Sequence, residues 1–97
     1  MKILDLSLTY HWYDMIAGGE KKEEYREIKD FYITRLVDRG TWNARKYDAI
    51  RFHRGQGSPV TMLVECLGIE VGKGRPEWGA PEEDVFIIKL GEIIKED

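Results

Sequence analysis

The charged stretch GGEKKEEYRE, at residues 18–27, holds the side chains best suited to chemistry. Lys21, Glu24 and Arg26 bring an ammonium group, a carboxylate and a guanidinium group close together in the sequence. In a strand Glu24 and Arg26 share a face, so the carboxylate can pair with the guanidinium group and orient it. Part of the guanidinium N–H donors then stays free to bind a phosphate or a carboxylate. Gly19, just before them, lets the backbone of a turn approach a ligand closely. The stretch predicts either a ligand site or an exposed edge strand whose charge prevents pairing with other chains.

The same residues form the pattern Gly-x-Lys-x-x-Glu-x-Arg, with Gly19, Lys21, Glu24 and Arg26 at its fixed positions. This pattern resembles the signature of ASCH domains, a β-barrel group within the PUA-like superfamily. The flanking segments agree with it, since an apolar helix with Trp12 precedes the motif and YDAIRFHRG, VTMLVECLGI and DVFIIKL follow it. The resemblance covers essentially the whole chain. It implies an RNA-binding or nucleotide-binding domain whose ligand cleft lies beside the motif.

The resemblance also keeps an enzymatic alternative open. Some small ASCH proteins hydrolyse modified nucleosides as amidohydrolases, and ribonuclease activity on single strands is known in the family. For such an enzyme Lys21 and Glu24 are the candidate catalytic residues. In the amidohydrolase type, however, a threonine activated by the motif lysine stands where this chain has Glu24, so the hydroxyl nucleophile is missing at that place. Thr9 is the nearby hydroxyl to inspect in the folded cleft.

Lys21 is the residue that we most expect to contact a ligand, with Glu24 orienting Arg26. As a lysine at the start of a strand, it is expected to support no core. Trp78, in the Gly- and Pro-rich stretch 72–84, either stacks on a base or pins its loop onto the barrel. We predict no cofactor and no metal site, because His11, His53 and Cys66 do not have the spacing of metal ligands.

Charge is unevenly distributed along a chain whose net charge is −3. The segment 35–54 is basic inside an otherwise acidic protein, and we expect Arg51 and Arg54 in it to reach a ligand. Two interpretations remain open, a surface charged for solubility and a patch that faces phosphates. The basic residues of the segment, set against Asp38 and Asp48, are Arg35, Arg39, Arg45, Lys46, Arg51 and Arg54.

Length and composition indicate one globular domain over residues 1–97, with 42% hydrophobic residues. A lone cysteine, Cys66, favours a reducing compartment, and we expect a cytoplasmic protein. The first ten residues do not form a signal peptide, and no stretch approaches the roughly 20 apolar residues of a membrane-spanning helix. We therefore expect a soluble protein that associates with no membrane.

Residues that alternate between two faces predict strands at 3–8 and 46–52. A run with an excess of apolar residues predicts a long strand at 60–71, and a β-branched run predicts another at 85–94 with a bulge or turn at Gly91. The charged segment 21–28 is a further, weaker strand. Thr9 caps a first helix with Trp12, Met15 and Ile16 on its inner face, closed by Gly18 and Gly19 in left-handed conformation, and Asp30 caps a second helix that runs to Gly40. The inner stripe of that second helix is expected to be Phe31, Leu36 and Val37. The sum is an α+β, mainly β fold, a small curled and mostly antiparallel β-barrel with two or three short helices.

Overall fold

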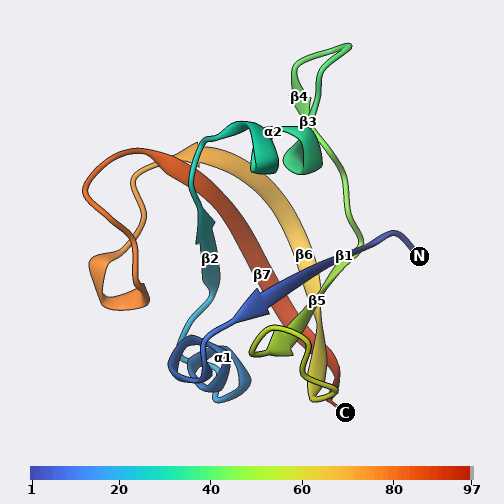
Figure 1. Cartoon of the computed structure of the whole chain (residues 1–97), viewed down its shortest axis with the longest axis vertical. Helices are drawn as coiled ribbons and strands as arrows, with labels where there is room; N and C mark the ends of the chain where they lie inside the picture. Colours follow the sequence, from blue (N-terminus) through green and yellow to red (C-terminus); the bar gives the residue numbers. More distant parts are fainter. Residues whose placement is uncertain (97) are drawn as a thin grey trace.

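Five strands form a curled sheet in the order β1-β5-β6-β7-β2, and two more form a separate hairpin (Figure 1). The computed structural model describes residues 1–96. Its elements are β1 (Ile3–Leu8), α1 (Tyr10–Ala17), β2 (Glu23–Arg26), α2 (Asp30–Leu36), β3 (Val37–Asp38), β4 (Asn43–Ala44), β5 (Ala49–Arg54), β6 (Thr61–Gly72), the 3₁₀ helix η1 (Pro76–Trp78) and β7 (Val85–Glu96). The predicted fold class, a small curled and mainly β sheet with two or three short helices, is confirmed.

The sheet is antiparallel except where β1 pairs with β5. That pair is parallel because the chain leaves β1, passes through α1, β2, α2 and the hairpin, and then enters β5 in the same direction. Strand β1 and strand β2 are the two edges of the sheet. The curl brings these edges toward each other, and the guanidinium Nη2 of Arg26 on β2 donates a 2.8 Å hydrogen bond to the carbonyl of Ser7 on β1.

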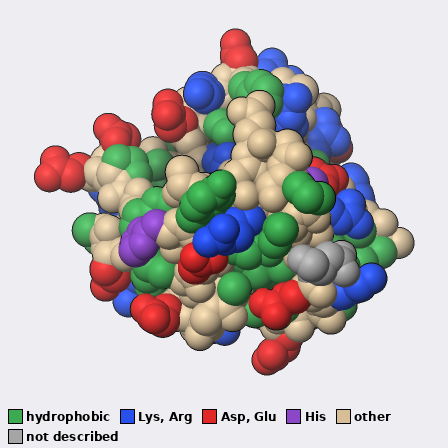
Figure 2. Space-filling model, turned by 60° about the horizontal axis from the view of Figure 1, so that its bottom comes forward, with side chains coloured by type: hydrophobic (Ala, Val, Ile, Leu, Met, Phe, Trp, Pro, Cys, Tyr) green, Lys and Arg blue, Asp and Glu red, His purple; other side chains and the backbone are tan. Residues whose placement is uncertain are grey.

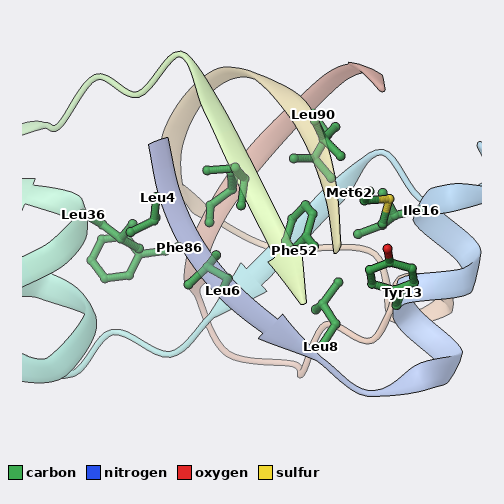
Figure 3. Packing of buried hydrophobic residues seen from close by; sticks show 13 residues of the cluster. Leu4, Leu6, Leu8, Tyr13, Ile16, Leu36, Phe52, Met62, Phe86 and Leu90 are labelled. Carbon is green, nitrogen blue, oxygen red and sulfur yellow. The ribbon is translucent and has the colours of Figure 1, made fainter. Parts of the chain in front are cut away.

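The core fills the concave side of the curl, as the alternation in the sequence predicts. Leu4, Leu6 and Leu8 of β1 are buried, as are Ile50 and Phe52 of β5. Figure 3 shows Tyr13 and Ile16 of α1 entering the core at one end and Leu36 of α2 at the other. The two helices thus close the two ends of the curled sheet.

Helix α1 differs in detail from the expected one. Thr9 occupies the N-cap position, but its side chain makes no capping hydrogen bond. Tyr13 and Ile16 are the buried residues of the helix, whereas Trp12 only packs against the core from outside. Gly18 keeps a right-handed conformation, and Gly19 alone, with φ of 84°, makes the left-handed turn that leads into β2.

Helix α2 is shorter than predicted, because Val37 and Asp38 leave it to pair with Ala44 and Asn43 in the β3–β4 hairpin. This hairpin projects from the body of the molecule in Figure 1. The expected inner stripe is wrong for Phe31, whose exposed fraction is 53%, and right for Leu36. Asp30 is the first residue of the helix rather than its cap, which is Lys29.

Strands β6 and β7 are the longest, with 12 residues each, and they curve together across the whole fold (Figure 1). Their pairing shifts register between Val64 and Cys66, opposite the stretch from Leu90 to Ile93. The irregularity predicted at Gly91 is therefore present. Within residues 1–96 no helix is long and apolar enough to cross a membrane.

Candidate functional site

Lys21 is one of the largest fully buried side chains among residues 1–96, with an exposed fraction of 1%. Its Nζ donates a 2.5 Å hydrogen bond to the carbonyl of Trp78 and lies 3.3 Å from Oε1 of Glu24. The rings of Tyr25 and Trp12 flank it, with centroids 4.7 and 5.2 Å from Nζ. Burial lowers the pKa of Lys21, against the opposing attraction of Glu24. The expectation that this lysine supports no core is wrong, because it joins β2 to the loop before β7 from inside the fold.

Glu24 lies between two cations. One of its oxygens faces Lys21, and the other accepts from Nε of Arg26 at 3.0 Å, with Nη2 of the same guanidinium at 2.8 Å. Arg26 also donates from Nη1 to the hydroxyl of Tyr32 at 2.9 Å. Burial acts to lower the pKa of Arg26, but Glu24 and Tyr32 outweigh it and the pKa is raised. The predicted pairing of Glu24 with Arg26 is therefore present, as one half of a buried chain of charges.

A hollow of about 360 Å³, here called the motif hollow, opens beside Glu24 and Arg26. It lies where the edges β1 and β2 approach each other, and the 79–85 segment closes one side. Aromatic rings and polar groups share its wall. Its main side chains are Ser7, Thr9, Trp12, Glu24, Tyr25, Arg26, Glu27, Lys29 and Tyr32.

Only part of the predicted site gathers at this hollow. Glu24 and Arg26 line it, whereas Lys21 lies behind them and Gly19 serves the turn after α1. Trp78 is half-buried against Tyr25, Val85 and Ile87, and its carbonyl holds Lys21. Of its two predicted roles, this position corresponds to pinning the loop.

Arg51 and Arg54 lie away from the motif hollow and face carboxylates. Nη1 of Arg51 is 3.4 Å from Asp5, across the parallel β1–β5 pair. Arg54 makes two 3.0 Å hydrogen bonds to Asp14 of α1, which lower the pKa of that carboxyl. These two arginines of the basic segment are thus engaged in pairs that join surface elements.

The surface charge is nonetheless uneven. Figure 2 shows Lys and Arg side chains gathered along the upper right of the face in view, and Asp and Glu side chains along its left and lower margins.

Among residues 1–96 no three His, Cys, Asp or Glu residues come together in a group that could hold a metal ion. Every buried side-chain nitrogen or oxygen in the same residues has a hydrogen-bond partner.

Sequence reasoning missed Tyr32 and Ser7 and took Trp12 for a core residue. Tyr32 and Trp12 lie on helices, where apolar periodicity predicts only that a ring packs on the core. Both residues pack against the core and also line the motif hollow, because a ring can contact the core with one edge and a hollow with the other. Ser7 contributes its backbone carbonyl to Arg26, a contact for which a sequence holds no signal.

Tyr25 is a buried phenol with an exposed fraction of 9%. Its hydroxyl donates to Glu23 at 2.7 Å and accepts from the backbone N–H of Arg75 at 3.0 Å. Burial, aided by Glu23, raises the pKa of Tyr25 from 10.0 to about 12. The folded protein therefore holds this proton to higher pH than the unfolded chain does.

The pKa of Tyr25 predicts a specific loss of stability in alkali. Its contribution, about 2–3 kcal/mol at 1.36 kcal/mol for each pKa unit, is fully present below pH 10 and is lost as the pH rises toward 12. The difference in tyrosinate absorbance between the wild type and Tyr25→Phe should show one step near pH 12, with circular dichroism confirming that both remain folded. In urea the same step should fall near pH 10. A folded-state step near pH 10 would show that Tyr25 is not held as described.

No protein-family model, curated protein or solved structure matches this chain.

Proposed function

We propose that this protein binds RNA or a nucleotide in the motif hollow, as a domain of the ASCH type within the PUA-like superfamily. The observation that carries the proposal is that one hollow joins Glu24 and Arg26, two fixed positions of the motif, with the rings of Trp12, Tyr25 and Tyr32. Its volume of about 360 Å³ lies within the range of small-molecule sites, roughly 300–1,000 Å³.

The chemistry of the wall suits a nucleobase. Bases are recognised in proteins by stacking on aromatic rings or guanidinium planes and by hydrogen bonds to their edges. The Tyr32 hydroxyl accepts from Arg26, which leaves its proton to donate to a ligand. Lys29 at the rim supplies a cation for a phosphate.

The burial of Lys21 and the hydrogen bonds of its Nζ favour binding over hydrolysis. A lysine that activates a nucleophile must reach it, whereas Nζ of Lys21 is held by the Trp78 carbonyl and Glu24 and is sealed from the hollow. Ser7 and Thr9, two residues with hydroxyl side chains, line the hollow, so hydrolysis of a modified nucleoside or of single-stranded RNA stays a prediction for assay. A cytoplasmic setting is part of the proposal, consistent with the free thiol of Cys66.

The test removes one hydroxyl group from the wall. Tyr32→Phe keeps the ring and deletes the donor, so it should weaken binding of a fluorescein-labelled single-stranded RNA 10-mer about 2- to 10-fold, the effect of one hydrogen bond. Fluorescence anisotropy at fixed salt measures the affinity, because phosphate contacts make it salt-dependent.

Tyr10→Phe is the matched control. Tyr10 is 61% exposed and lies under Arg54, outside the motif hollow, so its variant should bind as the wild type does. The proposal fails if the wild-type protein binds neither this RNA nor nucleoside monophosphates, or if the two variants lose affinity equally.

A further inference from the structure

A second hollow, here called the α2 hollow, adjoins the first. It also has a volume of about 360 Å³, and the two share Ser7, Arg26 and Tyr32 in their walls. The Arg26–Tyr32 pair therefore stands between two adjacent spaces of equal size. Beyond the three shared residues the α2 hollow is lined by Asp5, Leu6, Phe31, Arg35 and Gln56.

Phe31 is an exposed aromatic ring at this place, although it lies on a helix whose other large apolar residues turn inward. Its exposed fraction is 53%, and its ring meets the Tyr32 ring edge-on with centroids 5.0 Å apart. The guanidinium carbon of Arg35 lies 3.6 Å from the centroid of Phe31, while Nη1 of Arg35 donates to the Phe31 carbonyl at 2.8 Å. Ring and guanidinium thus form one fixed stack beside the hollow.

The charges of the α2 hollow suit an anion. Arg26 and Arg35 bring two guanidinium groups to its wall. The one carboxylate there, Asp5, is already engaged, because its Oδ1 is 2.8 Å from Nε2 of His53 and 3.4 Å from Nη1 of Arg51. A phosphate near the Arg26–Tyr32 divide would therefore meet the guanidinium of Arg35 and that of Arg26, which is already paired with Glu24, beside a carboxylate that is itself compensated.

We propose that the α2 hollow is a second nucleotide subsite, in which a base stacks on the Phe31–Arg35 pair while its neighbour occupies the motif hollow. The inference rests on the proposed function and deepens it, since it makes the ligand a single-stranded oligonucleotide rather than a free nucleoside. Aromatic and guanidinium platforms at successive positions are how proteins hold single strands with little regard to sequence.

The experiment compares ligands of different length. Nucleoside monophosphates, dinucleotides and a hexaglutamate peptide compete with a fluorescein-labelled RNA 10-mer for the wild type, Phe31→Ala and Phe31→Trp. The dinucleotide should compete better than the monophosphates for the wild type. Phe31→Ala should weaken dinucleotide and 10-mer binding about 5- to 100-fold, as expected for loss of one stacked base, and leave the monophosphates unchanged. Phe31→Trp should retain the wild-type affinities.

Tyr10→Ala is the matched control, because Tyr10 is likewise an exposed ring under an arginine but lies outside both hollows. The inference is overturned, and the proposed function kept, if Phe31→Ala binds the 10-mer as tightly as the wild type while Tyr32→Phe weakens it. Displacement of the 10-mer by hexaglutamate as readily as by the dinucleotide would also overturn it, in favour of an acidic protein partner. If the wild type binds no nucleic acid at all, the proposed function fails as well.

Discussion

Lys21→Ala should lower the free energy of unfolding by about 3–5 kcal/mol, the usual cost of removing one partner from a buried ion pair. The substitution leaves the Trp78 carbonyl without its donor and Glu24 without one of its two cations. It also opens a cavity beside the rings of Trp12 and Tyr25, which now flank the lysine Nζ. Chemical denaturation followed by circular dichroism measures the change.

Two further variants separate charge from packing. Lys21→Met keeps most of the stem and should lose less than Lys21→Ala, so the difference reports the cavity. Lys22→Ala, at the exposed neighbouring position, should stay within about 0.5 kcal/mol of the wild type. A Lys21→Ala protein as stable as the Lys22→Ala protein would mean that the buried ammonium contributes nothing.

Glu24→Gln should be nearly as damaging, with a loss of about 3–5 kcal/mol, because it leaves the buried Lys21 and the partly buried Arg26 with no anion between them. The carboxylate now accepts from Arg26 at 3.0 Å and faces Lys21 at 3.3 Å. Glu24→Thr would introduce the threonine that the amidohydrolase type has at this position, but it should lose the same stability. It is therefore a poor test for hydrolase activity. Glu27→Gln is the matched control, because Glu27 is exposed and lines the motif hollow beside Glu24. This variant should leave the stability unchanged.

The double variant Lys21→Met/Glu24→Gln tests whether the two effects have one origin. If both arise from one buried pair, the double variant should lose clearly less than the sum of the single losses, with a coupling energy of about 1–3 kcal/mol. Additive losses would show that Lys21 and Glu24 stabilise the fold independently, contrary to the contacts described above.

Strands β1, β5, β6 and β7 were predictable because each carries its own signal. Leu4, Leu6 and Leu8 alternate with polar residues, and so do Ile50 and Phe52 on the strand that pairs with them. The Glu24–Arg26 pair was predictable for the same reason, since residues two apart share a face of a strand. These features depend on neighbours in the sequence alone.

The burial of Lys21 was not predictable, because every group that makes it tolerable comes from elsewhere. Its hydrogen-bond acceptor is 57 residues away, and the Trp12 ring comes from the preceding helix. The early end of α2 is a similar case, because Val37 has a helical neighbourhood and leaves it only to pair with Ala44. The parallel β1–β5 pair likewise depends on the path of the whole intervening chain.

The side-chain bond between Arg26 and Ser7 has a consequence for how the molecule fluctuates. It joins the two edge strands of the sheet through a guanidinium side chain, whereas neighbouring strands within the sheet are joined by a ladder of backbone bonds. Local opening costs least free energy where the fewest bonds must break. Strands β1 and β2 should therefore separate from each other more often than strands that are paired within the sheet. A ligand that binds between β1 and β2 would raise the free energy of this opening, because it binds the closed state only. Ligand binding and local opening of the two edges would then be thermodynamically linked.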